Sequence, residues 1–422
     1  MSKHFILTAY GSAGDIFPFV EIGRYLLTQN HRVTFITLPW FEALIKESGM
    51  TYIQLGTMDQ AVDLLNDPEV WNPRKGLTVI WRKGLGTNLL AIRSYVQSLD
   101  PDEEVVILAH PALMPTADLA RPGRANLKIV VVHPNPTPIS QCATRTYYGG
   151  VSMGEGMAPP KFPKRVTKLL FSLIDSLFLD REIVPALNRE RLRLGMTPIR
   201  HFLSHMQYAA DLYVTLFPEW FCPNKPDYPS PLINGDFVFF PSSGAEMSSE
   251  LTEFLAAGSA PIVFTSGTGF PHVKKYFQIA LDTVQRINAR AIFLCKFPEQ
   301  VPSDLPPSVL WQEYVPFEMI LPKVAIVVHH GGAGTFAEAG RAGMPQLAIP
   351  IAYDQFDNAL IIKDLGVGEA IPSQYLTVAR LERKLTEMLG SQAMREKCKQ
   401  VAAHFTSGLK VSQTTDKILA AI

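Results

Sequence analysis

Cysteines and long apolar runs are scarce in this sequence of 422 residues. Its four cysteines, Cys142, Cys222, Cys295 and Cys398, lie far apart and form no C-x-x-C pair, so neither a disulfide framework nor a paired-cysteine zinc or redox motif is indicated. No apolar run reaches the roughly 18 residues that a membrane-spanning helix requires. The first residues, including HFILTAYG, are typical of a strand rather than of a signal peptide. These absences predict a cytoplasmic protein.

An excess of charge of either sign is missing as well. Lysine plus arginine and aspartate plus glutamate each number 39, and no basic block or tail is present. A protein that binds nucleic acid needs a broad positive field to neutralise the phosphate backbone. We therefore predict that this protein has no nucleic-acid partner.

Two motifs that would indicate other chemistry are absent or badly placed. Gly11 and Gly14 do not have the G-x-G-x-x-G spacing, and no acidic residue closes a second strand, which argues against a nicotinamide-dependent Rossmann dehydrogenase. The single D-x-D, Asp100-Pro101-Asp102, lies in a proline turn before a predicted strand. We interpret it as a solvated turn rather than a metal site, and we expect no metal.

The sequence does contain a regular alternation of strand and helix patterns. With 47% apolar residues, a chain of this length can build two hydrophobic cores. Short β-rich runs alternate with segments whose apolar residues have helical spacing. The expected strands are HFILTAYG, RVTFITL, TYIQL, EVVILAH, LKIVVVH and DLYVTLF in the first half, and APIVFTSG, RAIFLCK, SVLWQEYV, KVAIVVHH and MPQLAIP in the second. This pattern predicts an α/β protein with two doubly wound halves of about 200 residues each.

A proline-rich stretch from Cys222 to Ser243 predicts the connector between these halves. Its five prolines and one glycine oppose regular secondary structure. We expect an N-terminal domain at residues 1–225, a linker at 226–242 and a C-terminal domain at 243–405. The last segment, 406–422, is expected to form a helix that packs back toward the N-terminal domain.

The first candidate site follows the first predicted strand, where the sequence reads GSAGDIFPF. Open parallel sheets bind ligands at the carboxyl ends of their strands, where loops lead into helix N-termini. Gly11 and Gly14 permit a tight turn there, and Asp15 brings a carboxylate to the mouth of the loop. The alternative role for Asp15 is to cap the following helix.

In the second half, the corresponding positions hold TSGTG, Thr265 to Gly269, and HHGGAGT, His329 to Thr335. Glycines at 331, 332 and 334 allow backbone N–H groups to approach an anion, and a helix beginning near Thr335 adds its positive end. A diphosphate fits this loop. His330 can donate a hydrogen bond to it, more strongly once protonated near its ordinary pKa. The alternative is a strand end with capping residues.

A carboxylate and an amide follow the next strand, in GMPQLAIPIAYDQFDNA. Asp354 and Gln355 stand just beyond the expected end of that strand, and such a pair can hold hydroxyl groups bidentately. A helix cap is the alternative reading of these two residues.

Several of these motifs together resemble a known enzyme family. GSAGDIFPF, DPEVWNP, LFPEWFCP and VVHHGGAGTFAEAGRAGMPQLAIPIAYDQFDNA make the sequence similar to family 1 (UDP-glycosyltransferase-like) enzymes, including the bacterial rhamnosyltransferases of rhamnolipid synthesis and the sterol glucosyltransferases. The resemblance covers nearly the whole sequence. It implies the GT-B fold, in which two facing Rossmann-like domains enclose a cleft, the first binding an acceptor and the second a nucleotide sugar. It also implies inversion at the anomeric carbon without a metal.

The resemblance also assigns roles to individual residues of the second domain. The donor-binding residues that it implies are His330 and Thr335 for the phosphates, Ser266 and Thr268 in the same pocket, Gly332 and Gly334 in the loop, Glu338 for the ribose, Asp354 and Gln355 for the sugar hydroxyls, and Tyr314 with Val315 for the base. His329 is the alternative to His330, because the rhamnolipid relatives keep a histidine at that position and replace the next one with proline. Tyr314 could equally belong to the core.

At three places the sequence departs from the plant members of the family. They carry a histidine as general base where this protein has Asp15, as the rhamnolipid and sterol branches do, so Asp15 inherits that role. Phe317 stands where they have glutamine, and Ala333 and Gly334 replace their tryptophan and asparagine. The resemblance therefore fixes neither the sugar nor the base of the donor.

These residues predict an inverting, metal-independent glycosyltransferase. Attack of an alcohol on a sugar diphosphate needs a base for the hydroxyl proton and fixed positive charge for the leaving group, and Asp15 and the HHGGAGT loop supply these. The expected co-substrate is a UDP- or dTDP-linked hexose of the glucose or rhamnose type, with no further cofactor. The alternatives are a nucleotide-sugar epimerase and a non-catalytic partner of another transferase, although such a partner would have lost Asp15 or Asp354.

The expected acceptor is an apolar alcohol or lipid. Trp71 and Trp81 flank a charged turn, and residues 163–180, PKRVTKLLFSLIDSLFLD, carry apolar side chains on more sides than one core-facing stripe. Phe171 and Leu177 are the candidates from this helix, together with Ser12 from the first loop. Part of the helix would then line an apolar pocket or rest peripherally on the inner face of the membrane. The alternative is a helix buried between its neighbours.

Overall fold

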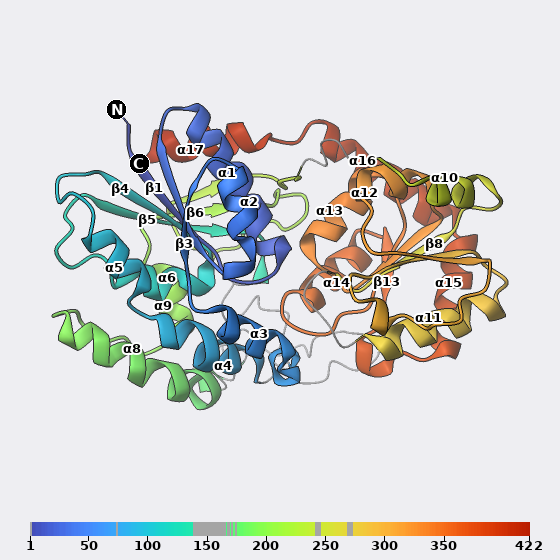
Figure 1. Cartoon of the computed structure of the whole chain (residues 1–422), viewed down its shortest axis with the longest axis horizontal. Helices are drawn as coiled ribbons and strands as arrows, with labels where there is room; N and C mark the ends of the chain where they lie inside the picture. Colours follow the sequence, from blue (N-terminus) through green and yellow to red (C-terminus); the bar gives the residue numbers. More distant parts are fainter. Residues whose placement is uncertain are drawn as a thin grey trace. The chain divides into compact units, whose positions relative to one another are not determined.

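Two parallel β-sheets organise the protein in the computed structural model (Figure 1). The structure describes residues 2–72, 75–137, 166, 169, 172–173, 175–240, 246–267 and 273–422. These residues divide into two units. Unit 1 comprises the described residues up to 137, those from 166 to 238, and 409–422, and unit 2 comprises those from 239 to 408.

The sheet of unit 1 has seven parallel strands in the order β3-β2-β1-β4-β5-β6-β7. The strands are β1 His4–Thr8, β2 Arg32–Thr37, β3 Thr51–Gln54, β4 Val105–Ala109, β5 Leu127–His133, β6 Leu212–Thr215 and β7 Leu232–Asn234. All residues of β1 and β4 are buried, as expected of central parallel strands that are covered on both faces.

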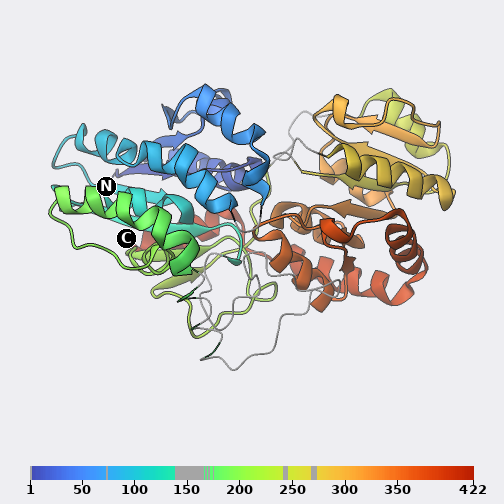
Figure 2. The ribbon, with the colours of Figure 1, turned by 90° about the horizontal axis from the view of Figure 1, so that it is seen from below.

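Helices lie on both sides of this sheet (Figures 1 and 2). They are α1 Ala13–Thr28, α2 Glu42–Glu47, α3 Met58–Asn66, α4 Gly76–Ile80, α5 Ala91–Gln97, α6 Met114–Asp118, α8 Arg181–Arg193, α9 Phe202–Tyr208 and α17 Val411–Ala421. Short 3₁₀ or π turns are η1 Pro39–Phe41, η2 Pro68–Trp71, η3 Trp81–Leu85, η4 Gly86–Asn88, η5 Pro111–Leu113 and η8 Ser176–Asp180. The last helix, α17, packs against α1 and β7.

The sheet of unit 2 has six parallel strands in the order β10-β9-β8-β11-β12-β13. The strands are β8 Ile262–Thr265, β9 Ala291–Leu294, β10 Val309–Gln312, β11 Ile326–His329, β12 Gln346–Ala348 and β13 Gly368–Ala370. The helices are α10 Ser249–Ala256, α11 Lys274–Arg286, α12 Phe317–Ile320, α13 Ala333–Arg341, α14 Gln355–Asp364, α15 Val378–Gly390 and α16 Gln392–Thr406, with turns η9 Pro298–Gln300, η10 Leu321–Lys323 and η11 Ser373–Tyr375. Helix α11 packs against α15, and α13 packs against α16.

The predicted α/β class with two doubly wound halves is confirmed, and two edge strands were not anticipated. Strand β7 lies inside the stretch expected to be a linker, and its three residues pair with β6. An edge strand has one unpaired side and therefore tolerates neighbouring prolines such as Pro231. Strand β13 begins at Gly368, which has weak strand propensity, so its three residues gave no pattern to detect.

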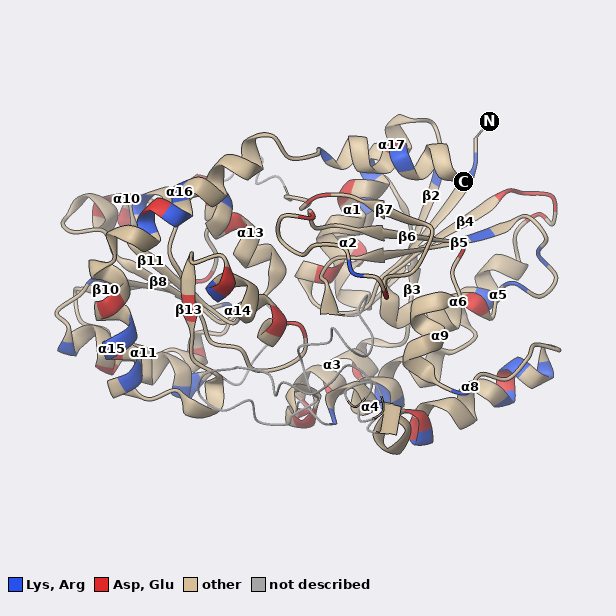
Figure 3. Ribbon diagram, turned by 180° about the vertical axis from the view of Figure 1, so that it is seen from behind, with Lys and Arg blue, Asp and Glu red and all other residues tan. Residues whose placement is uncertain are grey.

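Charged residues are spread over both units. Figure 3 shows acidic and basic residues interspersed along the ribbon rather than gathered by sign. Among the described helices, none is both long enough and apolar enough to cross a bilayer.

Candidate active site

Each sheet has one point at which the direction of the strand order reverses. In unit 1 this point lies between β1 and β4, and in unit 2 it lies between β8 and β11. At such a point, the two loops that follow the neighbouring strands diverge and leave a crevice outside the carboxyl ends. Asp15 follows β1, and His330 follows β11, so each unit presents a predicted site residue at its own switch point.

In unit 1, Asp15 lies in the first turn of α1 and is half-buried. Its Oδ2 accepts a hydrogen bond of 2.9 Å from the backbone N–H of Ser12, and the Ser12 hydroxyl lies 3.4 Å from the same oxygen. A Cβ atom on Gly11 would stand 2.2 Å from Oδ2, so this close approach requires glycine. The capping alternative therefore describes one carboxylate oxygen, while Oδ1 remains outside the cap.

A histidine that the sequence analysis did not single out faces the second oxygen. His110 follows β4, and its Nε2 lies 3.6 Å from Asp15 Oδ1. The backbone N–H of Ala112 donates to His110 Nδ1 at 3.3 Å. The dipeptide His-Pro directly after a buried strand was the available signal, because the carboxyl ends of β1 and β4 meet at one edge of the sheet.

The next strand ends in a second histidine, His133, which is fully buried. Burial lowers the pKa of His133 to about 3, with nearby His110 as a smaller cause, so its ring is neutral at pH 7. In the part of the chain that the structure describes, neither ring nitrogen has a hydrogen-bond partner. Its ring stacks against Tyr213 with centroids 6.4 Å apart.

In unit 2, Ser266 and His330 line a small cavity of about 170 Å³ at the switch point. Apolar side chains form much of its wall, and Lys275 and Ser373 add polar groups; the apolar members are Val273, Ile279, Ile349, Ile351 and Leu376. Lys275 was not anticipated, because it lies in the first turn of α11 outside any motif. This cavity brings the TSGTG and HHGGAGT loops together.

The His330 ring packs between two glycines. A Cβ atom on Gly267 would come within 2.5 Å of ring atom Cε1, and one on Gly332 within 2.5 Å of Nε2. Gly267 also has a φ of 78°, in the left-handed region that favours glycine. Both glycines are therefore needed to hold this imidazole, in addition to any role in admitting a ligand.

His330 is neutral at pH 7, which corrects the expectation that it titrates near its ordinary value. Burial lowers the pKa of His330 to about 4. Its Nδ1 is buried and has no hydrogen-bond partner among the described residues. A neutral imidazole still donates one N–H, so the ring can contact an anion, but without a full positive charge.

His329 faces the interior instead. It is fully buried, the backbone N–H of Gly331 donates to its Nδ1 at 3.2 Å, and its Nε2 lies 3.2 Å from Gln346 Oε1. Burial lowers the pKa of His329 to about 3. Both ring nitrogens are therefore occupied by contacts that tie the loop to β12.

The loop continues into α13, which begins at Ala333, two residues earlier than expected, with Gly332 as its N-cap. A Cβ atom on Gly334 would meet no described atom within 4 Å, and this glycine is exposed. Packing among the described residues therefore does not require glycine at this position. Close approach of a ligand to the backbone would require it.

Tyr314 and Glu338 lie near each other in unit 2. Tyr314 is 70% exposed, which excludes the core role left open from sequence, whereas the adjacent Val315 is buried. Partial burial raises the pKa of Tyr314, and the carboxylates of Glu338 and Glu318 raise it further. Glu338 accepts a hydrogen bond of 2.5 Å from Arg341, and burial raises its pKa.

Asp354 and Gln355 are both held by protein groups. The amide nitrogen of Asn358 donates to Asp354 Oδ2 at 2.9 Å. Gln355 Oε1 accepts hydrogen bonds from the backbone N–H groups of Ile351, at 2.8 Å, and Ala352, at 3.1 Å. The preceding residue, Tyr353, has a φ of 56°, which few non-glycine residues adopt. This loop is thus a defined, strained turn.

The predicted acceptor residues have different surroundings. Trp81 is 4% exposed and packs edge-on against Phe202 with centroids 5.6 Å apart, so it contributes to the core of unit 1. Trp71 is partly buried against the same core. Leu177 is 57% exposed. Phe171, like Thr268 of the predicted donor set, lies outside the described residues.

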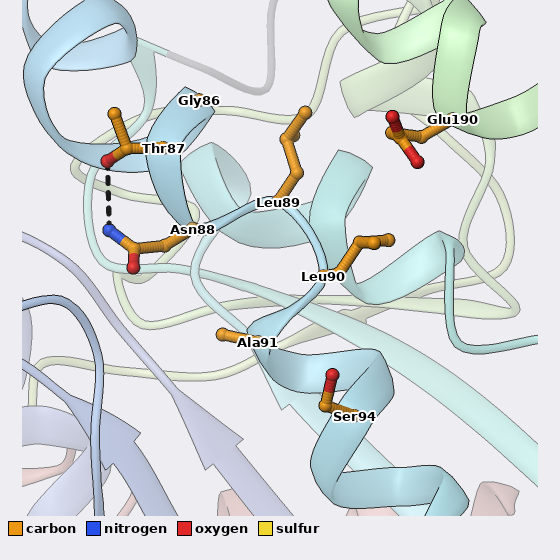
Figure 4. Close-up of a pocket in the computed structure, with 8 residues that line it drawn as sticks. All are labelled: Gly86, Thr87, Asn88, Leu89, Leu90, Ala91, Ser94 and Glu190. Atoms are coloured by element: carbon orange, nitrogen blue, oxygen red, sulfur yellow. Dashed lines mark hydrogen bonds between the residues drawn. The ribbon is translucent and has the colours of Figure 1, made fainter.

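A larger, open hollow of about 400 Å³ lies elsewhere in unit 1 (Figure 4). Residues from Gly86 to Ala91, Ser94 and Glu190 line it, and none of them belongs to the predicted sites.

The described residues contain no group of three or more His, Cys, Asp or Glu side chains arranged to hold a metal ion.

Known families match parts of both units. Residues 5–92 match the glycosyltransferase family 28 N-terminal domain, and residues 278–419 match the erythromycin biosynthesis protein CIII-like C-terminal domain. The chain is 26% identical to the O-mycaminosyltylonolide 6-deoxyallosyltransferase of Streptomyces fradiae over 90% of its own length and 86% of that protein. It is 24% identical to a sterol 3-beta-glucosyltransferase of Arabidopsis thaliana, covering 90% of this chain but 62% of that protein.

Solved structures of glycosyltransferases have the same fold. The glycosyltransferase of kitacinnamycin superposes over 100% of this chain and 99% of its own, with a TM-score of 0.73 and 17% identity. The glycosyltransferase VinC, solved in complex with dTDP, covers 99% of each chain with a TM-score of 0.65 and 17% identity. With a family 28 N-terminal match, an erythromycin-biosynthesis-CIII-like C-terminal match and these structural neighbours, the chain has the GT-B fold and is similar to glycosyltransferases along its length.

Proposed function

We propose that this glycosyltransferase transfers a hexose from UDP or dTDP to a hydroxyl group of an apolar acceptor, with inversion and without a metal. The observation that carries this proposal is the pair of switch points. One presents a half-buried carboxylate with one oxygen outside its helix cap, and the other presents a glycine loop at a helix N-terminus. These are the two groups that inverting sugar transfer needs, a base and a site for a diphosphate.

The donor would bind to unit 2. In this proposal the diphosphate lies on the N-terminus of α13, where Gly332, Gly334 and Thr335 expose backbone groups, and His330 donates an N–H to it. Ser266 shares the cavity with His330, and Thr268 belongs to the same set. His329 is given a structural role, because both its ring nitrogens already have protein partners.

The nucleoside would extend along α13. The exposed ring of Tyr314 is free to stack on a base, the neighbouring backbone at Val315 would read it, and Glu338 would accept a ribose hydroxyl. VinC was solved in complex with dTDP, which favours a thymidine or uridine nucleotide here. Asp354 and Gln355 would bind the sugar hydroxyls through the donor and acceptor capacity that their contacts within the loop leave available.

Asp15 would act as general base. It takes the proton of the acceptor hydroxyl as the oxygen attacks the anomeric carbon, and the bond to the diphosphate breaks with its electrons passing to the phosphate oxygen. Attack from the side opposite the leaving group inverts the anomeric carbon. Fixed N–H donors at the loop stabilise the charge that develops on the leaving group, each worth roughly 10²–10³-fold in rate.

The acceptor would be an apolar alcohol. The names of two relatives refer to O-mycaminosyltylonolide and to sterols as acceptors. In unit 1, the described residues Leu169, Leu173 and Leu177 expose more than half of their side chains at helical spacing. Leu177, with Phe171, would contact such an acceptor or the membrane surface that holds it, with Trp71 and Ser12 nearer the loops and Trp81 supporting them from the core.

The test is release of nucleoside diphosphate by purified protein supplied with UDP- and dTDP-hexoses, with and without added alcohols. We expect that release of nucleoside diphosphate requires an alcohol and rises with the chain length of that alcohol. It should fall about a hundredfold or more in Asp15→Asn. Each buried methylene would add up to about 0.8 kcal/mol. Conversion of the sugar nucleotide without an alcohol would identify an epimerase, and no turnover with any donor would identify a non-catalytic partner.

A further inference from the structure

We propose that His110 is the positioning residue of Asp15, fixing the carboxylate through an N–H directed at Oδ1. This inference rests on the proposed function, in which Asp15 removes the acceptor proton. Nothing in the sequence motifs singled out His110. It is the sheet order that brings it to Asp15, because β1 and β4 are neighbours although about a hundred residues separate them.

The backbone fixes where His110 stands. The backbone N–H of His110 donates to the carbonyl of Thr8 at 2.8 Å, which continues the pairing of β4 with β1 by one residue. The ring packs 6.5 Å, centroid to centroid, from Phe19 of α1 and is 8% exposed. The imidazole is therefore held beside the helix that carries Asp15.

The local hydrogen bonding fixes which nitrogen carries the proton. Nδ1 accepts the N–H of Ala112, so the neutral ring must carry its hydrogen on Nε2. That nitrogen lies 3.6 Å from Asp15 Oδ1 and has no other described partner. A shift of well under 1 Å on ligand binding turns this approach into a hydrogen bond.

The two carboxylate oxygens then have separate tasks. Oδ2 is committed to Ser12 and the helix cap, so it anchors the side chain. Oδ1 faces His110 with one lone pair and keeps the other for the acceptor hydroxyl. Without the imidazole N–H, the carboxylate is anchored through one oxygen only and can rotate away from the hydroxyl. The expected cost of this misplacement is about tenfold to a hundredfold in turnover.

Two substitutions separate this role from simple packing. His110→Phe keeps a ring in the Phe19 contact but removes the N–H, and kcat is expected to fall about tenfold to a hundredfold with donor KM unchanged. His110→Gln places an amide N–H near the position of Nε2 and is expected to restore most of kcat. Because the N–H favours the ionised carboxylate, the acid limb of the kcat–pH profile should move to higher pH in the Phe variant only.

The controls use the neighbouring strand end and Asp15 itself. His133→Phe makes the same ring exchange at a residue for which the described structure shows no hydrogen bond or ion pair with Asp15, and it should leave kcat unchanged. The double variant Asp15→Asn/His110→Phe should be no slower than Asp15→Asn alone, because the histidine acts through the carboxylate. In the wild-type protein, ¹⁵N spectra should show the Nε2–H tautomer of His110 and a shift of its Nε2 signal in Asp15→Asn.

The outcomes separate the inference from the proposed function. Equal kcat in the wild type and His110→Phe would overturn the inference, as would equal losses in the Phe and Gln variants, or an Nδ1–H tautomer. If Asp15→Asn itself retained full turnover, the proposed general base would fail, whatever His110 does. If Asp15→Asn were slow but His110→Phe were not, Asp15 would remain the proposed general base and His110 would not be its positioning residue.

Discussion

At the scale of single residues, the donor loop depends on the packing of one imidazole. His330 is held between Gly267 and Gly332, and a methyl group on either would overlap the ring. Gly332→Ala should therefore displace His330 and weaken binding of UDP or dTDP about as much as His330→Ala does. Removal of a hydrogen bond to a charged group costs roughly 1.5–3 kcal/mol, or about tenfold to more than a hundredfold in Kd.

Isothermal titration of the nucleoside diphosphate measures this effect. Gly334→Ala serves as the matched control for overlap with His330, because a Cβ atom there meets no described atom. It should leave the free protein undisturbed, and any loss of affinity would come from the ligand's approach to the backbone. Full affinity in both Gly332→Ala and His330→Ala would show that the imidazole does not contact the nucleotide.

The same residues explain what the sequence could and could not predict about the site. Glycines, a carboxylate and histidines after apolar strands indicated the loops, since carboxyl ends of parallel strands converge. The protonation of His330 and the division of labour between His329 and His330 were not predictable, because they depend on burial and on contacts with Gln346 across the sheet. His110 was missed because its partner, Asp15, follows a different strand, β1, and lies in the first turn of α1.

At the scale of secondary-structure elements, a buried ion-pair network joins three helices of unit 1. Asp118 ends α6 and contacts Arg191 of α8 and, at 3.2 Å, His205 of α9. Burial alone raises the pKa of Asp118, but hydrogen bonds from His205 and Arg191 outweigh it and hold the pKa at about 2, below the ordinary 3.8. The carboxylate therefore stabilises the folded state above pH 4, and this stabilisation is lost as the pH falls toward 2.

The difference between these two pKa values corresponds to about 2 kcal/mol. Asp118→Asn should lower the free energy of unfolding at pH 7 by about 3 kcal/mol or more, because Arg191 loses its counter-charge in a buried site. Urea unfolding, followed by tryptophan fluorescence, measures the loss of stability caused by the substitution at pH 7 and the smaller contribution of the carboxylate at pH 3. Glu182→Gln is the control, because that carboxylate pairs with Arg82 at an exposed position outside the Asp118 network. Equal losses in the two variants would contradict the proposed role of burial.

The elements themselves were predictable to different degrees. Central strands such as β1 and β4 are continuous apolar runs, and their periodicity was sufficient to find them. The edge strands β7 and β13 have three residues each, next to proline or beginning with glycine. Their pairing is decided by the neighbouring strand rather than by local propensity, so no window of sequence reveals them.

At the scale of the whole molecule, each unit has its own hydrophobic core, and all predicted donor residues lie in unit 2. A ligand that binds only the folded form stabilises it by about 2.7 kcal/mol at a concentration 100 times its Kd. Trp311 is the single tryptophan of unit 2, since the other four of the five lie in unit 1. UDP or dTDP should therefore raise the unfolding temperature reported by Trp311 more than that reported by the remaining tryptophans in Trp311→Phe.

Thermal unfolding of the wild type and of Trp311→Phe is followed by fluorescence with and without the nucleotide. The difference between the two proteins gives the signal of Trp311. Trp311 is partly buried on the edge strand β10 of unit 2, where it donates its indole N–H to the carbonyl of Cys295 at 3.0 Å, so its fluorescence reports the packing of this unit. Equal shifts for the two signals would mean that the units unfold as one cooperative system. A shift confined to the tryptophans of unit 1 would contradict the assignment of the donor to the HHGGAGT loop.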